Sequence, residues 1–181
     1  MKITPLALEG VFEIRLEPRR DERGYFMRWY DTDLFAKAGL PTDWVQGNES
    51  RSTRGVVRGL HFQRPPHAET KLVRAVLGRI HDVFVDLRRG SRTYGKWGAI
   101  ELSDESANAV VIPKGFAHGF CTLSDAAVVS YLVDHVYAPQ AEGGLLWNDP
   151  SVGIDWPLAG EAIVSAKDRG WPTLAKLEPI G

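Results

Sequence analysis

Two of the five histidines lie in segments whose pattern suits acid–base chemistry. In Leu60-His61-Phe62-Gln63, strand alternation places the two apolar residues on one face and His61 with Gln63 on the other. His118 ends a Pro-x-Gly-x-x-His motif that begins at Pro113, and this motif predicts a tight strand-to-strand corner that turns the histidine inward. Because a free imidazole titrates near neutral pH, either ring could take up or release a proton during a reaction.

The same two histidines could instead hold a metal ion, because the His118 motif resembles the second half of the cupin motif pair. The first half of that pair, in metal-binding cupins, resembles Gly-x5-His-x-His-x3-4-Glu. Here Gln63 stands where the second histidine would be, and Glu69 follows too late. An amide is a poor ligand for transition metals, and two histidines fall short of the usual three protein ligands. We therefore expect no bound metal.

The three remaining histidines are assigned no chemistry. His67 follows Pro65-Pro66 in a predicted loop, so a surface position is expected. His81 shares a strand face with Val83 and Val85, which predicts a core or barrel-lining histidine whose hydrogen bonds are satisfied. His135 comes after a predicted strand.

The elements that must position these residues are mainly strands. The segments are short, rich in Val, Ile and aromatic residues, and bounded by turn residues, which indicates a sandwich or barrel rather than a parallel α/β sheet. We predict a mainly β, cupin-type jelly-roll barrel with a few short helices, formed by residues 1–181 as one domain, with N-terminal strands and a C-terminal tail packed on the barrel. The predicted strands are 11–14, 56–62, 72–77, 80–87, 97–102, 109–112 and 128–133.

Helix signals are few. Asp31 or Thr32 can cap a helix that Gly39 ends, with Leu34, Phe35 and Ala38 as its buried stripe. A short helical turn is expected within residues 165–174.

Composition excludes several classes of function. The 181 residues are 44% hydrophobic and 25% charged, which suits a globular chain long enough to bury a core. Because 22 Lys and Arg balance 23 Asp and Glu, a sequence-independent grip on nucleic acid is not expected. No apolar run approaches the ~18 residues that span a membrane, and the N-terminus lacks a signal-peptide core. Cys121 is the single cysteine, so we expect no intrachain disulfide and a cytoplasmic protein.

Many fragments occur in one collinear order from about Asp21 to Pro172. They are Asp21-x-Arg23-Gly24-x-Phe26, Gln46-x-Asn48-x-Ser50, Arg58-Gly59-Leu60-His61-Phe62-Gln63-x-Pro65-Pro66, Lys71-Leu72-Val73, Asp82-Val83, Asp86-Leu87-Arg88, Ile112 to Phe120, Tyr131, Tyr137-Ala138-Pro139, Trp147-Asn148-Asp149-Pro150 and Lys167-Asp168. Together they closely resemble the dTDP-4-dehydrorhamnose 3,5-epimerase family. The resemblance implies a jelly-roll homodimer that acts on nucleotide-linked 4-keto-6-deoxy sugars without a cofactor.

The resemblance also implies roles for individual residues. His61 resembles the general base, and Asp168 resembles the carboxylate that pairs with it. Tyr131 resembles the acid on the opposite face of the sugar, and Lys71 the group that steadies the enolate. Substrate contacts are implied for a second set: Arg58 at the pyrophosphate, His118 and Tyr137 in the site, Gln46 and Asn48 at the nucleotide, and Arg23 and Phe26 reaching over from a partner subunit.

The chemistry of epimerisation requires such groups. To invert a carbon next to a ketone, a base removes a proton from one face and an acid delivers one to the other, with no redox cofactor. A carboxylate beside His61 would orient its ring and stabilise the imidazolium. A lysine would stabilise the enolate where its charge develops, and the forked guanidinium of Arg58 matches a phosphate.

Taken singly, each of these residues has a plainer interpretation. Tyr131 shares a face with two valines and could be a core residue, and Asp168 could form a surface pair with Lys167. Arg58 could be a solvated strand residue, and Lys71 an exposed residue at the start of a strand. The collinear resemblance favours the catalytic interpretation.

The chain departs from the family pattern at two positions. Arg28 stands where the family often has Glu near the nucleotide base, and Glu69 stands where it usually has Gln, two residues before the lysine. Three alternatives to the 3,5-epimerase stay open: an epimerase that inverts one carbon or uses another nucleotide, a metal-dependent cupin oxygenase or isomerase, and a sugar-binding cupin without catalysis.

Overall fold

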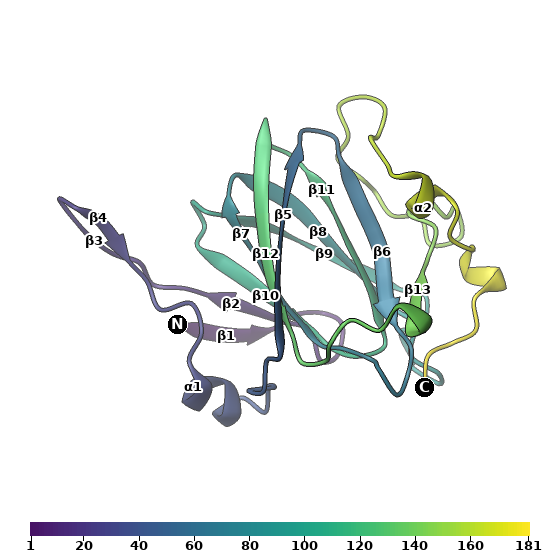
Figure 1. Cartoon of the computed structure of the whole chain (residues 1–181), viewed down its shortest axis with the longest axis horizontal. Coiled ribbons are helices and arrows are strands. Elements are labelled where there is room, and N and C mark those ends of the chain that lie inside the picture. Colours follow the sequence, from purple (N-terminus) through teal and green to yellow (C-terminus); the bar gives the residue numbers. More distant parts are fainter.

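Two antiparallel sheets face each other in the computed structural model, which describes all residues 1–181 (Figure 1). One sheet has six strands in the order β1-β2-β10-β7-β12-β5, and the other has five in the order β13-β6-β11-β8-β9. No strand pairing joins the sheets into a closed barrel. The bounds are β1 Lys2–Pro5, β2 Phe12–Arg15, β5 Gln46–Thr53, β6 Val57–Gln63, β7 Lys71–Leu77, β8 Arg79–Asp86, β9 Trp97–Ser103, β10 Asn108–Ile112, β11 Phe116–Thr122, β12 Ala126–Val133 and β13 Glu142–Gly144.

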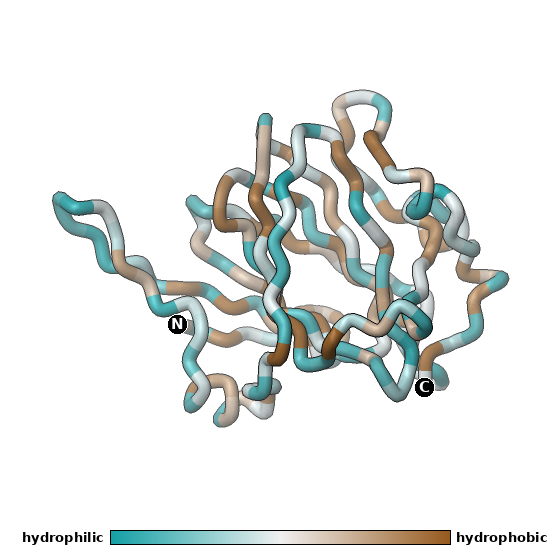
Figure 2. The backbone as a smooth tube through the Cα atoms, viewed as in Figure 1, coloured by the Kyte–Doolittle hydropathy of each residue, from teal (hydrophilic) through white to brown (hydrophobic).

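Three apolar clusters explain why the central strands are hydrophobic on both faces. The first fills the space between the sheets and includes Phe84 and Phe120. The second lies on the outer face of the five-stranded sheet, where the C-terminal tail covers it with Ile180. The third lies outside the six-stranded sheet, beneath Phe35 of the helix α1. Figure 2 shows hydrophobic residues running along the strands of both sheets.

The helix α1 (Thr32–Lys37) begins where its cap was predicted, because the Asp31 side chain accepts a hydrogen bond from the Leu34 backbone N–H. Gly39 follows the helix with a φ of +70°, a conformation that favours glycine. Phe35 is buried as expected, whereas Leu34 is exposed, so that part of the predicted stripe is wrong. The expected turn in the tail is the short helix α2 (Ala166–Arg169), capped by Ser165 and followed by the 3-10 turn η2 (Leu174–Lys176).

The seven predicted strands all form, within a residue or two of their expected ends. Two long strands were missed. β5 has the sequence QGNESRST, and it carries no apolar alternation because one face lines a polar cavity and the other meets solvent. β11 was not predicted as a strand. The corner predicted for the motif from Pro113 to His118 forms at residues 113–115 and turns His118 towards the cavity, and His118 is the third residue of a wholly buried strand.

A short hairpin projects from the body of the molecule (Figure 1). It consists of β3 (Arg19–Asp21) and β4 (Gly24–Phe26), and every residue of the two strands is exposed. Its tip is hydrophilic (Figure 2), whereas Tyr25 and Phe26 are 55% and 70% exposed.

None of the helices reaches the length and hydropathy that crossing a membrane requires. The 3-10 turn η1 (Pro139–Ala141) leads into the edge strand β13. Near the C-terminus, Ile180 forms an isolated parallel β-bridge with Arg88, which fixes the end of the tail against the five-stranded sheet.

Candidate active site

A cavity of about 570 Å³ opens between the two sheets. The five-stranded sheet contributes side chains from β6 and β11, and the six-stranded sheet contributes side chains from β5, β7 and β12. The segment 163–168 at the start of α2 completes the wall. The cavity therefore has two facing walls built from residues that are far apart in the sequence.

His61 and Asp168 form a pair on the wall of the five-stranded sheet. The His61 Nε2 and Asp168 Oδ1 atoms lie 2.6 Å apart, and the Gly59 N–H donates to the other carboxylate oxygen at 3.3 Å. Asp168 is buried, whereas the His61 side chain is 37% exposed towards the cavity. Burial opposes ionisation of Asp168, but the hydrogen bond and charge of His61 prevail and lower the pKa of this carboxyl.

The geometry of this pair leaves one ring nitrogen of His61 available. In the neutral imidazole, the nitrogen that donates to Asp168 carries the proton, so the other keeps its lone pair. A base of this kind is oriented by the carboxylate, and its protonated form is stabilised by the same contact.

Tyr131 lies on the opposite wall, on β12, and packs partly against the core between the sheets. Its burial, and next the charge of Glu69, raise the pKa of the phenol, while Arg58 acts in the other direction. The Lys71 Nζ atom lies 5.8 Å from the centre of the Tyr131 ring. Lys71 is buried, contrary to the plainer interpretation of it as an exposed residue at a strand start.

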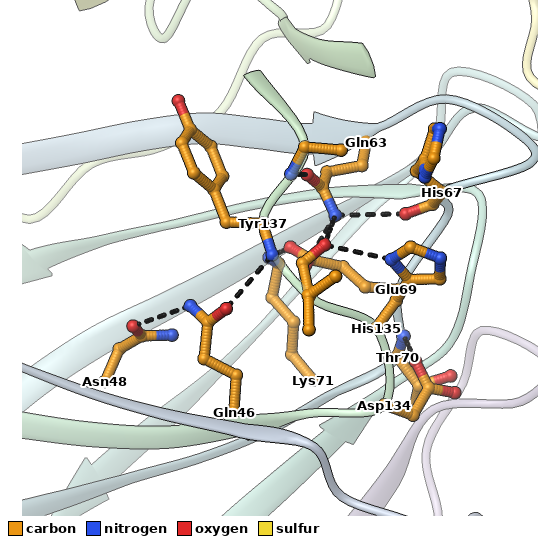
Figure 3. Close-up of polar contacts among 12 residues, drawn as sticks. Gln46, Asn48, Gln63, His67, Glu69, Thr70, Lys71, Asp134, His135 and Tyr137 are labelled. Carbon is orange, nitrogen blue, oxygen red and sulfur yellow. Dashed lines mark hydrogen bonds and ion pairs between the residues drawn. The ribbon is translucent and has the colours of Figure 1, made fainter. Parts of the chain in front are cut away.

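The Gln63 side-chain amide is the centre of a hydrogen-bond network (Figure 3). Its Nε2 donates to the His67 carbonyl at 3.0 Å, to Glu69 Oε2 at 3.0 Å and to the Val136 carbonyl at 3.3 Å. Its Oε1 accepts from the Ala138 N–H at 2.6 Å. The amide is therefore tied to two loop segments, 64–70 and 134–138.

His118 stands beside His61 in the strand register of β11 and β6, and it lines the cavity. Its Nε2 bonds Asp82 Oδ2 at 2.8 Å. Asp82 is fully buried; burial raises its pKa, and His118 partly counteracts this. Each histidine is thus committed to a carboxylate of its own, and no group of three His, Cys, Asp or Glu side chains is placed to hold a metal.

The expected substrate contacts divide into three sets. Arg58 and Tyr137 line the cavity. The Arg58 Nε donates to Ser52 Oγ at 2.9 Å, and the Tyr137 hydroxyl donates to Glu142 at 2.8 Å.

Gln46 and Asn48 lie next to the cavity rather than among the residues that line it. They share a face of β5 and are hydrogen-bonded to each other at 3.0 Å. The Gln46 side chain also accepts from the Tyr137 N–H at 3.0 Å, which ties β5 to the cavity rim.

Arg23 and Phe26 lie outside the cavity, on the projecting hairpin. Within one chain they do not meet His61, and their contribution to a neighbouring subunit stays a prediction.

Among the cavity residues that were not predicted from the sequence as site residues are three charged ones: Glu49, Glu142 and Lys167. Lys167 Nζ pairs with Glu142 Oε1 at 2.6 Å at the rim. Glu69, singled out only as a departure from the family, also lines the cavity. Lys167 could have been predicted as a site residue because it directly precedes Asp168. No local sequence pattern indicates Glu142.

Two histidine predictions need correction. His67 was expected at the surface, but it is half-buried, with its ring 5.0 Å from that of His135 and its Nδ1 buried without a partner. His81 was expected to have its hydrogen bonds satisfied, but its Nε2 is buried without a partner beside Trp156. Burial lowers the pKa of His81.

A jelly roll whose two sheets place a His–Asp pair opposite a phenol and a buried lysine defines a class, that of isomerases which move protons on a bound substrate. The model of the dTDP-4-dehydrorhamnose 3,5-epimerase family matches residues 5–176, and the chain belongs to this family. A dTDP-4-dehydrorhamnose 3,5-epimerase from Methanothermobacter thermautotrophicus is 49% identical over 170 residues, covering 93% of this chain and 91% of the relative.

Further comparisons agree on the fold, which is of the cupin type. A dTDP-4-dehydrorhamnose 3-epimerase from Streptomyces niveus is 45% identical over 182 aligned positions, covering 100% of this chain and 87% of its own. NovW, a 4-keto-6-deoxy sugar epimerase from Streptomyces spheroides, superposes with a TM-score of 0.94 at 46% identity, covering 97% and 88% of the two chains. The Legionella pneumophila enzyme in complex with dTDP-4-keto-L-rhamnose has a TM-score of 0.94 at 36% identity, covering 98% and 94%.

Proposed function

We propose that this chain inverts C3 and C5 of dTDP-4-dehydro-6-deoxyglucose to give dTDP-4-dehydrorhamnose, without a cofactor. One observation carries the proposal: His61 with Asp168 lies on one wall of the cavity, and Tyr131 lies on the facing wall. A sugar ring between the walls would meet a base on one face and an acid on the other. This is the arrangement that inversion of a carbon centre requires.

In the first step the free nitrogen of His61 takes the proton from a carbon next to the C4 ketone. The C–H electron pair forms a double bond from that carbon to C4, and the π pair of the C4 carbonyl moves onto its oxygen as an enolate. The Lys71 ammonium donates to that oxygen and stabilises its charge. The Tyr131 hydroxyl then delivers a proton to the other face of the carbon as the enolate collapses back to the ketone, which leaves a phenolate. The His61 imidazolium, stabilised by Asp168, gives its proton to water, and the phenolate takes one from water, so that both groups are reset. C3 and C5 both flank C4, so one set of groups can serve both positions.

The remaining residues hold the substrate in this proposal. Arg58 binds the pyrophosphate with its forked donors, and His118 and Tyr137 contact the sugar. Gln46 and Asn48 contact the nucleotide, with Arg23 and Phe26 added from the second subunit of a homodimer. A nucleotide-sugar substrate and a single cysteine both suit a cytoplasmic enzyme.

Proton NMR of the 4-keto sugar nucleotide in D₂O tests the reaction directly. We expect solvent deuterium at both C3 and C5. Deuterium at C3 alone would favour a single-position enzyme, the second candidate, which the 45% identity to the Streptomyces niveus 3-epimerase supports. Binding without any exchange would overturn the proposal in favour of a sugar-binding protein.

A further inference from the structure

We propose that Glu69 is a positioning residue for this reaction: its carboxylate anchors the Lys71 ammonium in the cavity and keeps Tyr131 in the phenol form that donates a proton. The inference rests on the proposed function, because it concerns the acid side of the same site. It begins with the ion pair between Glu69 Oε1 and Lys71 Nζ, in which both side chains are only 10% exposed.

The carboxylate of Glu69 is itself firmly held (Figure 3). One oxygen contacts Lys71, and the other accepts from Gln63 Nε2 at 3.0 Å. Gln63 is fixed in turn by the His67 and Val136 carbonyls and the Ala138 N–H. The position of the Glu69 carboxylate is therefore set by Gln63, which is itself held by backbone groups of two loop segments.

The ion pair with Glu69 restricts the position of the Lys71 ammonium, which the flexible lysine side chain alone would not do. A lysine carries its ammonium on a flexible four-carbon stem with three donors. When one donor is engaged by Glu69, the others remain for an oxygen in the cavity. Lys71 lies near the Tyr131 ring, so the anchored ammonium and the phenol share the wall of the six-stranded sheet.

The same carboxylate acts on Tyr131 through its charge. A phenolate forming near Glu69 would place two negative charges in a buried site, which disfavours ionisation. Burial and Glu69 both raise the pKa of Tyr131, whereas Arg58 opposes them. Tyr131 consequently stays protonated to higher pH than it would without Glu69.

Other charged groups around the cavity are largely neutralised by partners of their own. Asp168 pairs with His61, Glu142 with Lys167, and Asp82 behind the wall with His118. Three groups complete the surroundings of Glu69 and Tyr131: the cavity residue Glu49 on β5 and, behind Gln63, the contacting rings of His67 and His135. Glu69 is the carboxylate that pairs directly with Lys71 beside the Tyr131 ring.

The test compares Glu69→Gln, which removes the charge at nearly constant size, with Glu69→Asp, which keeps the charge on a shorter stem. Glu101→Gln on β9 is the matched control, because it removes a half-exposed carboxylate outside the cavity. Glu69→Ala is the second charge-removing variant if Glu69→Gln does not fold. Tyr131 ionisation is followed by phenolate absorbance, as the difference between each protein and its Tyr131→Phe counterpart. The pH dependence of kcat is measured on the same proteins.

In Glu69→Gln we expect Tyr131 to ionise at lower pH than in the unmodified protein, and the alkaline limb of kcat to move with it. Its kcat at neutral pH should fall on the order of tenfold to 10²-fold, because Lys71 loses its anchor. Glu69→Asp should restore the alkaline limb but not the full rate, and Glu101→Gln should behave as the unmodified protein.

Ionisation of Tyr131 at the same pH with and without the Glu69 charge would overturn the inference. So would an unchanged alkaline limb in Glu69→Gln. The phenolate titration needs no substrate, so it still tests Glu69 if the unmodified protein exchanges no sugar protons, the separate result that would refute the proposed function.

Discussion

His61 has two distinct sides, and its proposed role depends on both. One ring nitrogen is bound to the buried Asp168, and the rest of the ring faces the cavity. Tyr131 faces His61 from the other sheet. In the proposed reaction His61 removes the proton from one side of the sugar, and Tyr131 delivers a proton from the other. The two groups should therefore have separable kinetic effects when each is changed alone.

We expect His61→Ala to abolish exchange of the sugar's α-protons with solvent, with a loss of about 10²-fold to 10⁴-fold. Tyr131→Phe should slow completed inversion more than exchange, because His61 can still remove and return a proton on its own face. Both rates come from one NMR time course in D₂O. Normal exchange in His61→Ala would show that another group is the base.

The carboxylate partners of the two histidines also bear on metal dependence. His61 and His118 each use Nε2 to bond an aspartate, and Gln63 is tied to two loop segments. We expect the reaction rate to be unchanged after prolonged chelation and removal of the chelator. A loss of activity that a divalent ion restores would revive the metal-dependent cupin alternative.

At the scale of elements, the end of β8 shows how one side chain fixes a loop. Asp86 is fully buried and accepts from Arg88 Nη2 at 2.8 Å, Ser91 Oγ at 2.6 Å and Thr93 Oγ1 at 2.6 Å. Burial alone would raise the pKa of Asp86, but the Arg88 contacts and the two hydroxyl contacts outweigh it and lower the pKa to about 2. The turn from β8 to β9 therefore depends on an ionised carboxylate.

This shift predicts a pH-dependent contribution to folding. The pKa of Asp86 is lower in the folded protein than the ordinary aspartate value of 3.8, so the stabilisation is complete above that value. As pH falls from about 5 towards 2, the free energy of unfolding should lose about 2 kcal/mol from this group. Asp86→Asn should lack that portion of the pH dependence in urea unfolding, whereas Asp125→Asn, at an exposed position, should keep it. Equal pH dependence in Asp86→Asn and the unmodified protein would contradict this.

At the scale of the whole molecule, the projecting hairpin is the feature that a single chain does not explain. Two strands of three residues cannot be stable alone, and the hairpin exposes Tyr25 and Phe26 away from both sheets. A partner subunit that receives Arg23 and Phe26 at its own cavity would account for this arrangement. The proposed homodimer would then contain two shared sites.

Complementation between two inactive variants tests this sharing. Arg23→Ala and His61→Ala should each be nearly inactive, but a mixed dimer has one site that combines an intact His61 with an intact Arg23. Random pairing makes about half of the dimers mixed, so co-refolding equal amounts should recover roughly a quarter of the unmodified activity. Activity no higher than that of the parents, with mixed dimers present, would mean that each chain builds its own site.

The sequence by itself determined the features that neighbouring residues encode. Alternation of apolar and polar residues placed Leu60 and Phe62 in the core and His61 on the cavity side, because a strand repeats every two residues. The Asp31 cap is equally local. The collinear resemblance added the family, which the comparisons confirm.

Only the tertiary structure decided the contacts between distant segments. Asp168 follows His61 by 107 residues, and the packing of α2 on β6 brings them together. The polar strand β5 and the buried strand β11 escaped prediction because their patterns reflect what lies across from them, a polar cavity or two hydrophobic layers. Glu69 gained its place from the fold of its loop onto Gln63 and Lys71. Local pattern specifies which face a side chain occupies, whereas sheet register and packing specify what that side chain meets.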